Sequence, residues 1–121
     1  MVAPSVFEVP PLNKRKRIPM KTIRAIAKFI AEKFNPERII LFGSQARDTA
    51  DSRSDAHFLV ICRISGKRRD MVNRIDRELN GLRMARDIVI LTPEEFERDK
   101  HIPGTIARPA WKEGKVLYEH S

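Results

Sequence analysis

The stretch GSQARDTADSRSDAHFLV, which runs from Gly43 to Val60, decides the fold of this chain. A short apolar run, Arg38 to Phe42 (RIILF), leads into it and is typical of a β-strand. The end of the stretch opens a second predicted strand, Asp55 to Cys62, which is mostly apolar after His57. We therefore expect this second strand to lie inside a sheet, with a polar connection between the two strands.

The residues at the ends of these two strands indicate a phosphate and metal site. A glycine followed by a serine, as in Gly43-Ser44, lets the backbone approach a phosphate closely while the hydroxyl donates a hydrogen bond to it. Ten residues separate Ser44 from Asp55. Asp55 and His57 project from the same face of a strand because they are two positions apart, as paired metal ligands would.

Apolar periodicity predicts further elements on both sides of this stretch. They are helices at Met20–Phe34, at about Lys67–Met84, after Thr92 and at about Thr105–Glu113, and strands at Asp87–Leu91 and Lys115–Tyr118, the last at a sheet edge. Thr92, Pro93 and Glu95 have the order of an N-cap, a first-position proline and a capping-box acid.

The order of these elements brings the polar strand ends together. A crossover helix between the second and third strands makes them parallel, so that Asp55 and Asp87 lie at the same sheet edge. If the first strand is antiparallel to the second, Gly43 and Ser44 meet that edge too. Asp87 follows Arg86, however, and a surface ion pair between charged neighbours is an alternative role for it.

The length and net charge of the chain indicate how many domains it has and which kinds of partner it favours. A chain of 121 residues with 41% hydrophobic content predicts one globular domain, which we place at residues 20–121. The 24 Lys and Arg against 16 Asp and Glu give a net charge of +8, which favours polyanionic partners: nucleic acid, nucleoside triphosphates or an acidic protein surface.

The first 19 residues have a different composition from the rest. They contain four prolines and the basic run Lys14 to Arg17 but no packing pattern, so we interpret residues 1–19 as a mostly disordered arm. The apolar runs of the chain are too short to span a bilayer, and the N-terminal composition is not that of a secretory signal. The lone Cys62 predicts a buried, unreactive thiol, and we expect a cytoplasmic protein.

These features together resemble the nucleotidyltransferase superfamily that includes DNA polymerase beta, in particular its minimal nucleotidyltransferase (MNT) members. The family motif is Gly-Ser, ten residues, then Asp-x-Asp. The likeness extends to DIVILTPEEF at Asp87–Phe96 and AWKEGKVLYE at Ala110–Glu119, and so covers roughly residues 20–119. The resemblance implies an α/β (α+β) nucleotidyltransferase fold, a small mixed β-sheet with helices packed on it.

The resemblance also implies a role for each matching residue. Gly43, Ser44 and Arg47 would bind the phosphates of the nucleotide. Asp55 and Asp87 would be the catalytic carboxylates, and they would hold Mg²⁺ or Mn²⁺ for a reaction on ATP.

Position 57 departs from the family motif. His57 stands where the family has its second aspartate, and imidazole supplies one nitrogen and no negative charge. His57 would be a third metal ligand, and Mn²⁺ would accept it more readily than Mg²⁺. Asp48 stands where the family commonly has glycine and adds a negative charge near the phosphate loop.

The activity that the resemblance implies is transfer of AMP from ATP to a protein. The partner would be a HEPN-type toxin ribonuclease, with this chain as its antitoxin in a toxin–antitoxin pair. Two alternatives remain open. The chain could be a catalytically degenerate MNT-fold binding module that neutralises its partner by contact, or a nucleic-acid-binding protein that uses the basic arm and the surface of Arg68, Arg69, Arg74 and Arg77. The sequence is also compatible with a homo-oligomer.

Overall fold

The fold follows the predicted order of helices and strands. The computed structural model describes residues 19–43, 46, 56–81 and 86–120. The elements are α1 (Met20–Phe34), β1 (Arg38–Phe42), β2 (Ala56–Ile61), α2 (Arg68–Glu78), β3 (Arg86–Leu91), α3 (Pro93–Asp99), α4 (Ala107–Glu113) and β4 (Lys115–Glu119). The expected α+β class is confirmed.

The four strands form one mixed sheet in the order β3-β2-β1-β4. β1 is antiparallel to both β2 and β4, whereas β2 and β3 are parallel. The prediction that the second strand lies inside the sheet is therefore confirmed, as is the position of the last strand at an edge. The register pairs Phe42 with His57 and His57 with Asp87, which aligns the polar ends of three strands.

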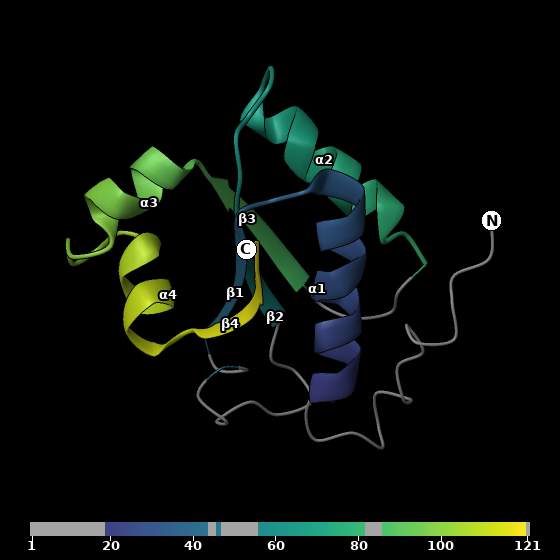
Figure 1. The fold of residues 1–121 in the computed structure, drawn as a ribbon, viewed down its shortest axis with the longest axis horizontal. Coiled ribbons are helices and arrows are strands. Elements are labelled where there is room, and N and C mark those ends of the chain that lie inside the picture. The colour runs from purple at the N-terminus through teal and green to yellow at the C-terminus, as the bar shows by residue number, and fades with distance from the viewer. Residues whose placement is uncertain (1–18, 44–45, 47–55, 82–85, 121) are drawn as a thin grey trace.

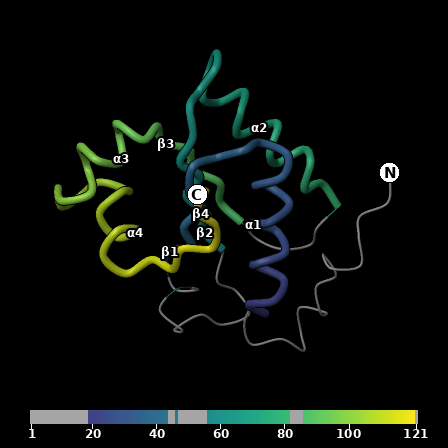
Figure 2. The backbone as a smooth tube through the Cα atoms, in the orientation of Figure 1, coloured from purple at the N-terminus to yellow at the C-terminus, as the bar shows by residue number. Residues whose placement is uncertain are grey.

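Helices cover both faces of the sheet. α1 and α2 lie on one side, and α3 and α4 lie on the other (Figure 1). The backbone trace in Figure 2 shows the same three layers, with the strands between the two pairs of helices. Two hydrophobic cores fill the spaces between the layers.

The residues of β2 alternate between these two cores. Phe58 and Val60 pack with α1 and α2, and Leu59 and Ile61 pack with α3 and α4. Each is at most 3% exposed, and burying a side chain of this size contributes roughly 1.5–3 kcal/mol. The strand is apolar on both faces because both are covered, which is what its sequence predicted.

Several element boundaries differ from the prediction. α2 was expected to reach Met84 but ends at Glu78, because Gly81 adopts a φ of +101° in the turn that follows. α4 begins two residues later than expected, after Thr105. The predicted arm lies outside the described residues except for Pro19, which is the N-cap of α1 and whose carbonyl accepts hydrogen bonds from the amides of that helix.

Two expectations from composition can be compared with the structure. Within the described ranges, the chain has no helix with the length and apolarity needed to span a bilayer. Cys62 is a free, buried cysteine. Burial and the nearby Glu37 carboxylate raise the pKa of the Cys62 thiol, which keeps it protonated and unreactive at neutral pH, as the sequence predicted.

The start of α3 is fixed by the predicted capping box. The Thr92 hydroxyl accepts a hydrogen bond from the Glu95 amide at 3.1 Å, and the Glu95 carboxylate accepts one from the Thr92 amide at 2.9 Å. Arg68 of α2 reaches the same carboxylate with two hydrogen bonds of 2.8 and 2.7 Å. Glu95 therefore joins α3 to α2 across the end of β3, where Arg68 also donates to the Ile90 carbonyl.

We predict that Glu95→Gln lowers the free energy of unfolding by about 1–2 kcal/mol at pH 7. The Arg68 hydrogen bonds, and next the Thr92 amide, lower the pKa of Glu95 from its ordinary 4.5 to about 2. A lowered pKa stabilises the fold fully above the unfolded value, and the contribution is lost as the pH falls through about 2. Chemical denaturation between pH 7 and pH 2 should show the difference between variant and wild type shrinking below pH 4.5.

Glu94→Gln is the matched control, because Glu94 is an exposed acid in the same first turn of α3. It should change stability by only a few tenths of a kcal/mol, from the helix dipole. A difference between Glu95→Gln and wild type that does not vary with pH would contradict the ionic role of Glu95.

Candidate functional site

The end of β1 is shaped by Gly43. Its φ of +82° lies in the left-handed region, which a residue with a side chain adopts only with strain. A Cβ atom at this position would also lie 3.2 Å from Cδ2 of His57. The glycine thus lets the backbone turn away from the sheet directly over the imidazole.

His57 and Asp87 lie side by side on β2 and β3. His57 Nδ1 and Asp87 Oδ2 are 3.7 Å apart, which is beyond a hydrogen bond but within the range of an ion pair. The side chains are 34% and 58% exposed, so both are open to a ligand from solvent. On its other side the imidazole contacts the Phe42 ring, with the centroids 5.3 Å apart.

The predicted convergence at one sheet edge is confirmed for the three site residues that the structure describes, Gly43, His57 and Asp87. Ser44, Arg47 and Asp55 lie outside the described residues, and Asp48 does too. The Arg86 guanidinium contacts Asp76 at 3.2 Å, whereas the Asp87 carboxylate lies beside His57. No local pattern predicted the contact of Phe42 with His57, because this contact depends on strand register.

The described side chains at the polar edge supply only some of the ligands that a divalent metal ion needs. Nowhere in the described ranges do three or more His, Cys, Asp or Glu side chains form a group that could hold a metal ion. His57 and Asp87 offer one nitrogen and one carboxylate, a pair of donors that Mn²⁺ accepts better than Mg²⁺ does. Further ligands would have to come from the nucleotide, water or residues such as Asp55.

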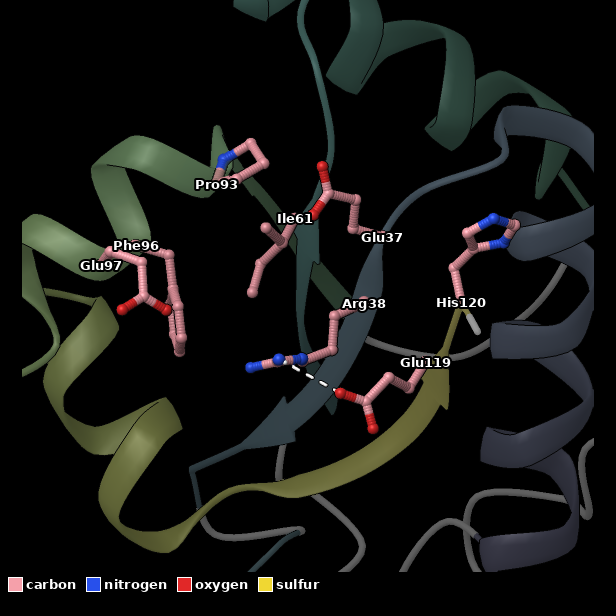
Figure 3. Close-up of a pocket in the computed structure, with 8 residues that line it drawn as sticks. All are labelled: Glu37, Arg38, Ile61, Pro93, Phe96, Glu97, Glu119 and His120. Atoms are coloured by element: carbon pink, nitrogen blue, oxygen red, sulfur yellow. Dashed lines mark ion pairs between the residues drawn. The ribbon is translucent and has the colours of Figure 1, made fainter.

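A cavity of about 400 Å³ lies at the opposite edge of the sheet (Figure 3). Its walls come from the start of β1, the ends of β2 and β4 and the start of α3. Three carboxylates line it, Glu37, Glu97 and Glu119, and the single arginine, Arg38, pairs with Glu119 at 3.1 Å. An excess of negative charge would repel a triphosphate, so this cavity is a poor nucleotide site.

One of the four α2 arginines that were predicted as a nucleic-acid-binding surface has an internal partner instead. Arg68 is held by Glu95 and by the Ile90 carbonyl, and it therefore stabilises the fold. The hypothesis of nucleic-acid binding by α2 therefore depends on its other three arginines, Arg69, Arg74 and Arg77, all of which are exposed.

Comparison with known protein families identifies the class of protein to which this fold belongs, the nucleotidyltransferases. The sequence profile of the family described as polymerase beta, nucleotidyltransferase matches residues 24–121. The chain belongs to this family.

A solved structure supports the same fold. The chain is similar to a proposed nucleotidyltransferase from Sulfolobus solfataricus, with 20% identity and a TM-score of 0.56. The match covers 81% of this chain and 78% of the other. A search of curated proteins found no match. At this identity the likeness shows the fold alone.

Proposed function

We propose that this chain is a minimal nucleotidyltransferase of the MNT type that transfers AMP from ATP to a partner protein, a HEPN-type toxin, and so acts as its antitoxin. A hydroxyl oxygen of the partner attacks the α-phosphorus of ATP, the bond to the β-phosphate oxygen breaks, and pyrophosphate leaves. The observation that carries the proposal is the meeting of Gly43, His57 and Asp87 at one edge of a nucleotidyltransferase sheet.

Each residue of the edge has a proposed task. The positive φ of Gly43 supports a tight turn here, and the backbone amides of this turn, with the Ser44 hydroxyl and Arg47 by resemblance, would bind the phosphates of ATP. Asp87 and His57, together with Asp55, would hold Mg²⁺ or Mn²⁺. When bound, the metal would neutralise charge on the phosphates and lower the pKa of the attacking hydroxyl.

The presence of a histidine at the polar edge of the sheet favours a second candidate function. In the MNT motif a carboxylate stands at the position of His57, and an imidazole beside Asp87 brings less negative charge to a metal. On that ground the alternative is a degenerate MNT-fold module that neutralises its partner by contact without nucleotide transfer.

Labelled ATP separates the two functions. The chain and the protein that copurifies with it are incubated with ATP labelled at the α-phosphate and with Mg²⁺ or Mn²⁺. We expect label on the partner, and the rate with Asp87→Asn should fall about 100-fold or more, because loss of a metal ligand removes several kcal/mol of transition-state stabilisation.

Asp70→Asn is the control, since Asp70 is an exposed carboxylate in the first turn of α2, away from the polar edge. It should leave labelling unchanged. An unlabelled partner that is still inhibited by the wild-type chain and by Asp87→Asn would establish the binding module and rule out transfer.

A further inference from the structure

The most exposed large apolar side chains of the described residues lie in one part of the chain. They are Ile102, Ile106, Trp111 and Val116, which are 44–50% exposed. All four lie in the segment from the turn after α3 to the second residue of β4, whereas α1 buries its apolar stripe in the core. This part of the surface is therefore unlike the rest of the described surface.

Trp111 stands at the centre of a basic cluster. The ring of His101 meets the indole edge-on, with the centroids 4.4 Å apart. Lys100 Nζ lies 6.0 Å from the indole centroid, and the guanidinium carbon of Arg108 lies 5.8 Å from it. Lys100 also pairs with Glu97 at 2.7 Å, but Arg108 has no ion-pair partner among the residues that the structure describes.

The backbone beneath this cluster is held in place before any partner binds. The Thr105 hydroxyl lies 2.8 Å from the carbonyl oxygens of Asp99 and Ile102, and it accepts a hydrogen bond from the Arg108 amide. These contacts tie the end of α3 to the start of α4. A surface that is already ordered loses little conformational entropy on binding.

We propose that the Trp111 surface, formed by Lys100, His101, Ile102, Arg108 and Trp111, docks an acidic amphipathic segment of another protein. Tryptophan and arginine supply much of the energy at protein interfaces, and Ile102, which follows His101 in the chain and is 47% exposed, adds apolar area. The charge of Arg108, which forms no ion pair within the described ranges, is complementary to a carboxylate on the partner. The proposal is independent of nucleotide transfer, because it uses no residue of the polar edge.

A protein fits this surface better than a single-stranded nucleic acid does. A base that stacks on the indole would have to displace Lys100 or Arg108, which lie over the ring at 6.0 and 5.8 Å from its centroid. Phosphate contacts would also leave the exposed Ile102 side chain without an apolar neighbour. An acidic amphipathic segment would pair its carboxylates with Lys100 and Arg108, and its apolar side chains would cover Ile102 and Trp111.

Trp111 is the only tryptophan of the chain, so its fluorescence reports binding at this surface. The probe is a synthetic helical peptide of glutamate and leucine, titrated into the full chain. We expect a saturable shift of the emission maximum to shorter wavelength as the indole leaves water. Arg108→Glu should weaken the affinity about tenfold or more, since it places like charges opposite each other.

Arg74→Glu is the matched control, because it makes the same charge change on the exposed surface of α2. It should weaken the affinity less than about twofold. Arg108→Glu is suited to the test because an acid in the first turn of α4 favours the helix dipole, and thermal unfolding should show an intact fold.

Four results would overturn the proposal. The first is peptide binding, followed by anisotropy of a labelled peptide, without a change in Trp111 emission. The second is an equal loss of affinity in the two charge variants, which would mean general charge attraction. The third is equal binding of oligoglutamate, which would exclude an apolar contribution. The fourth is tighter binding of oligothymidylate with quenching of Trp111, which would assign the surface to nucleic acid.

Discussion

Gly114→Ala is expected to lower the free energy of unfolding by about 3 kcal/mol. The φ of Gly114 is −73°, which any residue adopts, so strain at this angle is not the reason. A Cβ atom here would overlap the Ala110 carbonyl oxygen and Cγ2 of Ile40, and it would lie 3.0 Å from the Leu41 carbonyl oxygen. Two of these atoms are backbone, so α4 or β4 would have to move away from β1.

Gly104→Ala is the comparison that separates packing from backbone strain. Gly104 has a φ of +89° and open space around its Cα, so alanine there costs only the left-handed strain, about 1–2 kcal/mol. Chemical denaturation of both variants measures the difference. If Gly104→Ala proves the more damaging substitution, the close approach of α4 and β4 to β1 is not what requires glycine at position 114.

His57→Asp is expected to raise the affinity for ATP in the presence of Mg²⁺ about tenfold, or roughly 1.4 kcal/mol. The substitution replaces a nitrogen donor beside Asp87 with a carboxylate, the ligand type that Mg²⁺ prefers. Two neighbouring carboxylates repel each other without a cation, so the gain should require the metal. Calorimetric titrations with Mg²⁺, and with a chelator in its place, measure both parts of the effect.

A matched variant shows whether the gain belongs to the polar edge. His120→Asp adds the same charge at the opposite edge, in the cavity lined by glutamates, and should not improve ATP binding. An affinity that is unchanged by His57→Asp would mean that another residue limits the site, and Asp48 is the first candidate because it is an acidic residue close in sequence to Gly43 and Ser44.

The elements with strong local signals could be predicted from the sequence. The apolar stripe of α1 and the cap of α3 each depend on residues within a few positions, and both have the expected bounds. The meeting of Gly43, His57 and Asp87 followed from strand directions alone, since a crossover helix fixes which strand ends share an edge.

Features that depend on long-range packing could not be predicted. The bond of Arg68 to Glu95 joins residues on different helices, and no local pattern distinguishes Arg68 from Arg69, its exposed neighbour. The requirement for glycine at position 114 comes from atoms of α4 and β1, which no local sequence pattern indicates. The predicted end of α2 was wrong for a different reason, because the prediction followed the apolar periodicity alone and passed over Asn80-Gly81, which is a turn signal.

The place of β1 between β2 and β4 has a consequence for the order in which the chain folds during synthesis. β2 follows β1 closely in the chain, but β4 is synthesised after the other three strands of the sheet. One edge of β1 therefore remains unpaired until residues 115–119 leave the ribosome. During this interval the run Ile39 to Phe42 offers free amide and carbonyl groups beside apolar side chains, which is a template for aggregation. Pausing of the ribosome before β4 should therefore reduce the yield of folded protein more than pausing after it.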